Sequence, residues 1–443
     1  MRVSMCLALV AFITAPASSS AETLKDALAL AYETNPTIRA ERARLRATKE
    51  ARAQAWAGAL PQISASGAYS KVDTMQSSSF SGTPQVSESK LDTLTAGVSA
   101  EQPVFTGFRN FNAIKQAGAR IRAGGAQLVG TEQQVLSDVA SAYFNVQRNM
   151  AVYELRKQNV TVLIRQQDMA SARFEVGEIT RTDVAQADAR LAESRARLSS
   201  SQGELAVARA AYAQLVGRTP GDLEPVETLP ELPETLEAAQ AIAFEYAPTL
   251  VATREQAEVS RRQVKIARGA ILPSVSLTAG YQYAEEPSFF VDNSEEFSFG
   301  ARASVPLFLG GANFSRIREA KALHTSDRAR LVEAERLVEA QTISAWERLV
   351  TARAVAVSAQ ASVDANNLAL EGVRQEALVG TRTTLDVLNA EQELLNAEVT
   401  LINALRDTQT AAFGLLAAIG VLTPDAIGID VESGEDRLKL YEH

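Results

Sequence analysis

Two long tracts of helical pattern are joined by one short polar stretch, Val379-Gly380-Thr381-Arg382-Thr383-Thr384-Leu385-Asp386-Val387-Leu388-Asn389. A second copy lies 203 residues earlier, in residues 176–186, with the sequence VGEITRTDVAQ. Gly177 corresponds to Gly380 and Asp183 to Asp386. A glycine followed three and six residues later by threonine and aspartate is typical of a helix that ends and a capped helix that begins. The twin turns therefore predict two helical hairpins.

The rest of the chain repeats around these turns. Residues 24–61 align with 236–273 at an offset of 212, and residues 103–217 align with 306–420 at an offset of 203. A fixed register over such lengths indicates internal duplication. We predict a first structural repeat over 22–217, a proline-containing linker over 218–235, a second repeat over 236–420 and a tail over 421–443. Long helices are expected over 107–215 and 310–420.

Composition excludes several classes of function. The chain has 443 residues, a formal net charge of -9 and a pI near 5.2, which argues against nucleic acid as its main partner. Its one cysteine is Cys6, and its two histidines are His324 and His443. No disulfide, no thiolate chemistry and no His/Cys metal centre is expected, although a carboxylate site stays open. We expect no cofactor.

The first 21 residues have the features of a secretory signal peptide. Arg2 supplies a positive charge, Met5 to Thr14 form an apolar core, and small residues precede a cleavage point after Ala21. No later stretch reaches 18 apolar residues, so an exported protein that crosses a membrane would have to do so as a β-barrel.

Four segments alternate between apolar and small polar residues, as strands do. They are expected at about 62–73, 91–103, 274–285 and 296–306. Runs of about ten residues with one apolar face are typical of a transmembrane barrel with a wet interior, although a soluble β-sandwich shows the same alternation. Four strands cannot close a barrel, so several chains must contribute to one; a trimer would give twelve strands.

Rods of helix follow each pair of strands. A helix from Gly107 to Val176 would be roughly 105 Å long at 1.5 Å per residue. Apolar positions at alternating spacings of three and four indicate a coiled-coil seam: Val135, Val139, Ala142, Val146, Asn149 and Tyr153. A fibrous coiled coil or an exported adaptor hairpin is the alternative interpretation.

Across 22–422 the chain resembles the TolC family of outer-membrane efflux channels. The resemblance is strongest in Arg173-Phe174-Glu175-Val176-Gly177 with Thr182-Asp183-Val184, in the second turn, and at Pro103-Val104-Phe105-Thr106-Gly107. It implies a mainly helical fold with a transmembrane β-barrel: a homotrimer in the outer membrane of a Gram-negative bacterium, four strands per chain, and a helical tunnel in the periplasm. The short helices and the chain ends would form an equatorial belt.

The resemblance also implies a gate at the turns. Arg382 matches one side of a latch between neighbouring helix pairs, and Asp183, with Thr182 beside it, matches the other side. Asp386 matches a ring of carboxylates that would attract cations to the pore. Helix capping is the alternative role of Asp183 and Asp386. An aromatic latch residue is replaced by Ala377 and a second acidic ring by Asn389, which predicts a looser gate with a weaker response to cations.

We therefore expect the passive exit duct of a tripartite efflux system or a type I secretion system, without enzymatic activity. The resemblance implies as partners a periplasmic adaptor (membrane fusion) protein, an inner-membrane pump of the RND or ABC type, and outer-membrane lipid. An exported structural protein is the alternative function. An enzyme, for example a carboxylate hydrolase, finds no supporting motif in the sequence.

Overall fold

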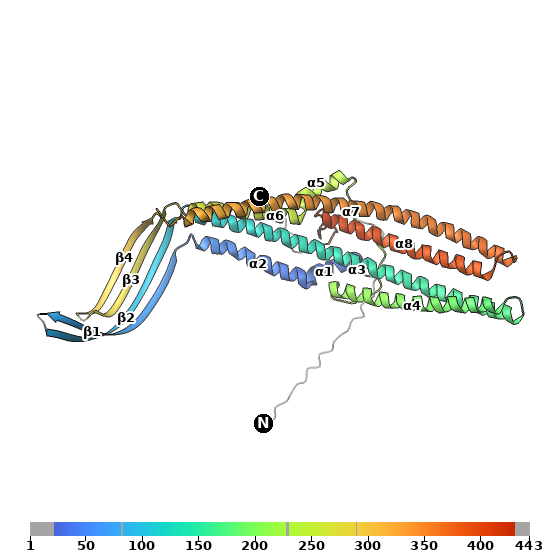
Figure 1. The fold of residues 1–443 in the computed structure, drawn as a ribbon, viewed down its shortest axis with the longest axis horizontal. Coiled ribbons are helices and arrows are strands. Elements are labelled where there is room, and N and C mark those ends of the chain that lie inside the picture. The colour runs from blue at the N-terminus through green and yellow to red at the C-terminus, as the bar shows by residue number, and fades with distance from the viewer. Residues whose placement is uncertain (1–21, 81–82, 227–229, 289, 430–443) are drawn as a thin grey trace, which may run out of the picture. The chain divides into compact units, whose positions relative to one another are not determined.

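The structure is a computed structural model that describes residues 22–80, 83–226, 230–288 and 290–429. The predicted signal peptide, residues 1–21, and the end of the predicted tail lie outside the described residues. Figure 1 shows the elements, which are, in chain order, α1 (Leu24–Thr34), α2 (Pro36–Ala57), β1 (Gln62–Phe80), β2 (Thr83–Phe105), α3 (Arg109–Glu175), α4 (Arg181–Val216), α5 (Leu236–Tyr246), α6 (Pro248–Gly269), β3 (Ser274–Ser288), β4 (Val291–Ser304), α7 (Ala312–Leu378) and α8 (Thr384–Ala418).

The duplication is confirmed element by element. Each half has a short helix, a helix of 22 residues that starts with proline, two strands, a helix of 67 residues and a returning helix of 35 or 36 residues. The short helices α1 and α5 end at Thr34 and Tyr246 because Asn35-Pro36 and Ala247-Pro248 stop them. Within the described residues, no helix combines the length and the apolar character that crossing a membrane requires.

Two compact units divide the chain, and they differ from the two predicted repeats. Within the described residues, unit 1 comprises 22–38, 132–239 and 342–429, and unit 2 comprises 39–131 and 240–341. Each unit takes equivalent pieces from both halves. The two units cut across the predicted repeats because the long helices α3 and α7 each contribute to both units.

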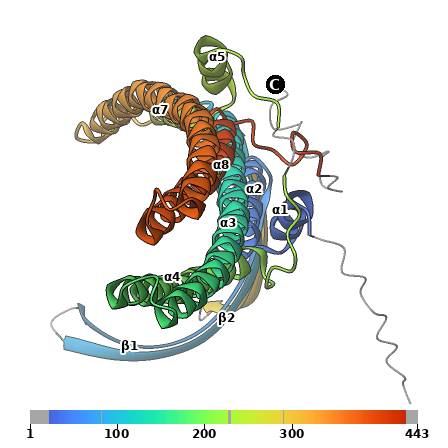
Figure 2. The ribbon, with the colours of Figure 1, turned by 90° about the vertical axis from the view of Figure 1, so that its right-hand side faces the viewer.

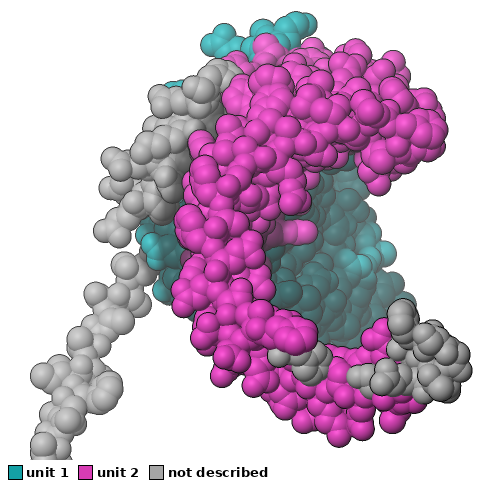
Figure 3. All heavy atoms as spheres, turned by 90° about the vertical axis from the view of Figure 1, so that its left-hand side faces the viewer, with its two compact units in different colours: residues 1–38, 132–239, 342–435 teal, residues 39–131, 240–341, 436–443 magenta. Residues whose placement is uncertain are grey.

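Unit 2 contains one antiparallel sheet in the order β1-β2-β3-β4. The helices follow the order of the strands. Gln116 of α3 donates a hydrogen bond to the Val259 carbonyl of α6 at 3.1 Å, and Ser260 of α6 lies 3.1 Å from His324 of α7. The result is a wall of helices that continues the sheet, and Figure 3 shows that this unit is hollowed on one side.

The first hairpin of the sheet is longer than predicted. β1 continues to Phe80 and β2 begins at Thr83, whereas strands were expected to end near 73 and to resume near 91. Backbone pairing continues between Asp73 and Lys90 and between Gln76 and Ser87. Apolar alternation stops in this serine-rich region, so the residue pattern had indicated a loop, although the backbone ladder needs no apolar side chains.

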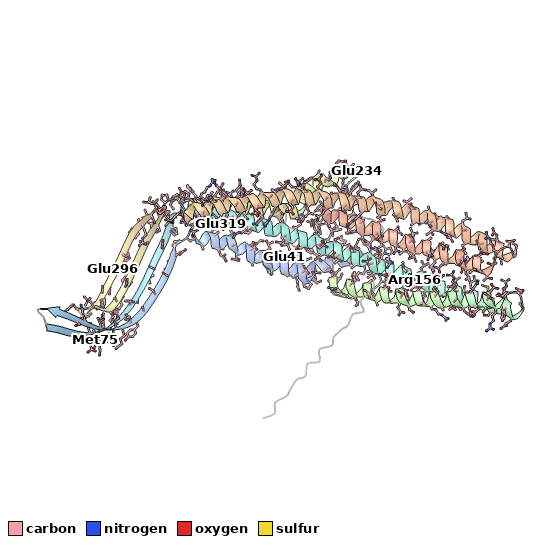
Figure 4. All side chains as sticks on the ribbon, viewed as in Figure 1. Glu41, Met75, Arg156, Glu234, Glu296 and Glu319 are labelled. Carbon is pink, nitrogen blue, oxygen red and sulfur yellow. The ribbon has the colours of Figure 1, made fainter. Side chains whose placement is uncertain are left out.

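Unit 1 is built around α3. Its predicted seam is buried at Val135, Val139, Ala142, Val146 and Asn149. α3 lies between α4 and α8, as Figure 2 shows. Arg156, labelled in Figure 4, donates to the Arg197 carbonyl of α4 at 2.8 Å, while Phe144 packs against Phe413 of α8 with ring centroids 5.7 Å apart.

The first described residue, Glu22, is buried in unit 1. The buried Glu22 carboxylate accepts hydrogen bonds from Tyr212 and from Arg218, both at 2.7 Å. Its backbone forms an isolated parallel bridge with Leu223. Burial, together with the Glu22 carboxylate, raises the pKa of Tyr212 above its usual range. The segment that precedes α1 is thus fixed to the linker between the two halves.

Candidate functional site at the hairpin tips

The two hairpin tips have the same backbone. Gly177 and Gly380 both have φ of 79°, a left-handed conformation that glycine adopts without steric cost. In the first tip, the Glu178 N–H donates to the Arg173 carbonyl at 2.9 Å; in the second, Thr381 donates to Glu376 at 3.0 Å. These bonds satisfy carbonyls at the ends of α3 and α7 in the pattern of a Schellman motif.

Each returning helix begins with a complete capping box. Thr180 and Thr383 share φ -88° and ψ 161°, and each side chain accepts a hydrogen bond from the backbone N–H of the aspartate three residues later. The Asp183 and Asp386 carboxylates accept from the threonine N–H at 2.9 Å and from its hydroxyl at 2.8 Å. Hydrogen bonds from Thr180 and Thr383 therefore lower the pKa of both carboxyl groups.

Capping leaves part of each carboxylate free. The capping bonds at Asp183 and Asp386 all use Oδ2, and among the described residues Oδ1 accepts no hydrogen bond. The carboxylate can thus fix the helix start and still present negative charge to the surroundings. The capping role and the predicted pore role are chemically compatible.

The ion pairs on the two tips are inverted. In the first, Arg173 at the end of α3 pairs with Glu178 of the turn at 3.0 Å. In the second, the residue equivalent to Arg173 is Glu376, which pairs with Arg382 of the turn at 2.7 Å. Hydrogen bonding to Glu376 raises the pKa of Arg382, and Asp386 adds to the rise. All four side chains are at least half exposed, so water screens both pairs and each contributes little to stability.

Within one chain, Arg382 and Asp183 are not partners. Arg382 pairs with Glu376, and Asp183 accepts from Thr180. Thr182, at the side of Asp183, is exposed. Any link between Arg382 and Asp183 would have to join two copies of the chain, which is the arrangement that the resemblance implies for neighbouring helix pairs.

Other residues join the hairpins, and among them only Asn389 is a predicted gate residue. Asn389 of α8, a predicted gate residue, accepts a hydrogen bond from Arg190 of α4 at 3.0 Å. Next to it, Glu391 accepts from Arg374 of α7 at 3.0 Å and from Gln166 of α3 at 3.4 Å. The Glu391 side chain is only 5% exposed, while that of Arg374 is 46% exposed.

A small apolar cluster supports these polar links. Leu388 of α8 packs with Val160 and Leu163 of α3 and with Leu191 of α4, and Leu198 lies against the cluster. Glu391 is one helical turn from Leu388, so the polar and apolar contacts form one connection between the hairpins. In the sequence, this connection is signalled by an acidic residue, Glu391, among the apolar positions of α8. Periodicity reveals such a residue only when the buried face of the helix is already known.

In the part of the chain that the structure describes, no three His, Cys, Asp or Glu residues gather as possible metal ligands.

Comparisons with known proteins agree with this architecture. The profile of a family described as "Outer membrane efflux protein" matches twice, over residues 27–218 and 242–421, which follows the internal repeat. The outer membrane efflux protein BepC of Brucella suis is 32% identical over 93% of this chain and 88% of its own length. The outer membrane protein TolC of Vibrio cholerae is 28% identical over 94% of each chain.

Solved structures show the same fold. The structure of CusC superimposes with a TM-score of 0.79 at 19% identity and covers 90% of this chain and 92% of its own. The outer membrane protein VceC of Vibrio cholerae gives a TM-score of 0.76 at 22% identity over 90% of this chain and 96% of its own.

Proposed function

The chain belongs to the outer membrane efflux protein family, whose members are outer-membrane exit ducts for efflux or secretion, and we propose that three copies close into one such duct, gated at the hairpin tips. The observation that carries the proposal is that the four-stranded sheet of unit 2 has two unpaired edges.

The sheet in unit 2 ends in two unpaired strands. β1 and β4 are at opposite edges of the order β1-β2-β3-β4, and Met75 on β1 and Glu296 on β4 mark these edges in Figure 4. In a bilayer, unpaired backbone groups of an edge strand are costly, so the edges must pair with other chains. Two different edges favour head-to-tail contacts that close a ring, and three copies would supply twelve strands.

Unit 1 also has outer helices that expose apolar side chains. α4 exposes Val207, and the part of α7 in this unit exposes Val350, Val357, Leu368 and Leu378. Apolar side chains on both outer helices favour packing of α7 of one copy against α4 of the next. The helical wall and the sheet would then close together.

The gate follows from the connection between the hairpins. Glu391 is held by Arg374 and Gln166, yet its Oε2 atom is buried without a hydrogen-bond partner among the described residues. Separating the hairpins would expose Oε2 to water, which offsets part of the cost of breaking the other bonds. A link that is incompletely satisfied suits a gate that a partner must open.

Partners are proposed from the same features. A passive duct supplies no energy, so an inner-membrane pump of the RND or ABC type and a periplasmic adaptor would be needed. Two relatives bear names for different cargo: alkaline protease secretion protein AprF and pyoverdine export outer membrane protein OpmQ, both of Pseudomonas aeruginosa. We propose that the cargo is set by the pump and that Arg382, Asp386 and Thr182 face the adaptor or the pore.

Planar-bilayer recording of the purified full-length protein tests the proposal. The expected result is discrete channels from a particle with three times the mass of the chain, with divalent-cation block that weakens in Asp386→Ala. A particle of single-chain mass, or protein recovered from the periplasm without detergent, would instead support a structural adaptor.

A further inference from the structure

We propose that a basic cavity at the junction of sheet and helices in unit 2 binds the headgroup of an anionic phospholipid from the periplasmic leaflet. The proposal rests on the membrane-spanning role proposed above for the sheet. It names a lipid class, a site and the residues that recognise it.

The cavity is open, has a volume of about 780 Å³, and lies between the start of α3, the end of α6 and the start of α7. No acidic residue lines it, whereas five basic residues do: Lys115, Arg262, Lys265, Arg268 and Lys321. The close approach of two glycines shapes its floor, since a Cβ atom on Gly107 would lie 2.3 Å from the Gly269 carbonyl oxygen.

Three of the five cations have neither a carboxylate nor an aromatic partner among the described residues. Arg262 is neutralised by Glu258 at 2.6 Å, and Lys115 lies over the Phe111 ring at 4.5 Å. Lys265, Arg268 and Lys321 are exposed and, among the described residues, form no ion pair. Three neighbouring uncompensated cations repel one another, and an anion placed between them would relieve that repulsion.

The next cavity along the same helices has a different character. It is lined by Arg254, Arg261 and Arg328, but also by Glu255 and Glu258. Glu255 is paired with Arg122 at 2.8 Å. Uncompensated positive charge without any lining acid is thus concentrated at the end of the helical wall that adjoins the sheet.

Strand register shows which face of the sheet this cavity adjoins. Phe105 of β2 is paired with Val275 of β3, and directly paired residues point to the same side of a sheet. Val275 belongs to the apolar face, with Leu277, Ala279 and Tyr281. The Phe105 ring contacts the Phe108 ring edge-on at 5.3 Å, and Phe108 lines the cavity. The cavity is therefore continuous with the apolar face that would contact lipid.

The lining matches a ligand with a charged and an apolar part. Phe108 is 61% exposed and Phe111 is 55% exposed, and Leu272 is exposed beside them. Exposed aromatic side chains next to lysine and arginine are typical of protein surfaces at the headgroup level of a bilayer. A phosphodiester would lie among Lys265, Arg268 and Lys321, with the acyl chains along Phe108 and the apolar face. A headgroup that carries an extra ammonium would be disfavoured there.

The test is lipid binding by the detergent-purified full-length protein, measured by native mass spectrometry with phosphatidylglycerol or phosphatidylethanolamine added at equal concentrations. We expect the wild type to bind phosphatidylglycerol at least tenfold more tightly. Each basic residue near an anionic headgroup contributes roughly a fivefold factor in affinity, so the variant Lys265→Gln/Arg268→Gln/Lys321→Gln should lose on the order of 100-fold.

A matched control removes three exposed arginines of α7 outside the cavity, in Arg316→Gln/Arg318→Gln/Arg336→Gln, and should keep the preference. Equal binding of the two lipids by the wild type, or unchanged binding in the cavity variant, would overturn the proposal. Thermal stabilisation by millimolar inorganic phosphate equal to that by phosphatidylglycerol would also overturn it, because it would indicate a simple anion site. If the triple variant does not fold, the single variants Arg268→Gln and Lys321→Gln provide the test, and each should lose about fivefold in affinity for phosphatidylglycerol. A protein that conducts ions but shows no lipid preference would refute this inference and leave the duct intact.

Discussion

The tip between α3 and α4 and the tip between α7 and α8 share one backbone, while the side chains that they carry differ. Glycine, threonine and aspartate occupy equivalent positions and make the same bonds. Around this frame, Arg173 is replaced by Glu376 and the exposed Asp188 by the buried Glu391. The turn chemistry thus fixes both hairpins, whereas a buried acidic residue in the contact between the hairpins follows only the second tip.

The largest difference between the tips is expected at the pair Asp188 and Glu391. Glu391→Gln should destabilise the protein by about 1–3 kcal/mol, because the neutral amide cannot form the ion pair with Arg374. The loss is limited because the guanidinium of Arg374 is partly exposed and stays hydrated. Asp188→Asn, its equivalent in the first repeat, should change stability by less than about 0.5 kcal/mol. Thermal melting in detergent measures both. Equal losses of stability would mean that Asp188 and Glu391 contribute equally to the two hairpins.

The turn backbone should respond equally in both repeats. Gly177→Ala and Gly380→Ala should each cost about 1–2 kcal/mol, since an alanine at φ 79° is strained although no atom lies within 4 Å of its Cβ. Gly203→Ala, in the interior of α4 with open space around it, is the control and should be neutral or stabilising. Unequal losses of stability at the two turns would show that contacts around one turn also determine its backbone conformation.

Much of this could be predicted from sequence, for physical reasons that differ by element. The turns and their caps are local: glycine, threonine and aspartate within seven residues determine them. The connection through Glu391 is not local, because Gln166, Arg374 and Glu391 come from three helices and only the packed structure brings them together. The outer half of the β1–β2 hairpin was missed because backbone pairing there continues without apolar alternation.

Acid should weaken both tips together. The pKa values of Asp183 and Asp386 are lowered by the capping bonds, so the stabilisation from these carboxylates is present above the ordinary pKa of 3.8 and is lost as the pH falls through the lowered value. Melting curves recorded from pH 7 down to about pH 2 should show this loss below pH 3.8, and Asp183→Asn/Asp386→Asn should reduce it. A double variant with the full acid sensitivity of the wild type would assign that sensitivity to other carboxylates.

The smallest effect on stability is expected for the exposed ion pairs. Exchanging the charges in Glu376→Arg/Arg382→Glu, or in Arg173→Glu/Glu178→Arg, keeps each pair within the chain and should leave the melting temperature close to that of the wild type, because water screens exposed pairs. Single variants that place like charges together should be slightly less stable than the exchanges. A large loss in either exchange would show that the tip charges have further partners in the assembled protein.

Single-channel conductance of the Glu376→Arg/Arg382→Glu protein tests the gate most directly. The exchange preserves the pair inside the chain but removes the guanidinium that Arg382 would offer to Asp183 of a neighbouring copy. We expect wild-type stability together with a several-fold higher resting conductance, and no such rise for Arg173→Glu/Glu178→Arg. A resting conductance equal to that of the wild type, or the same rise in both exchanged proteins, would contradict a gate held by the second tip.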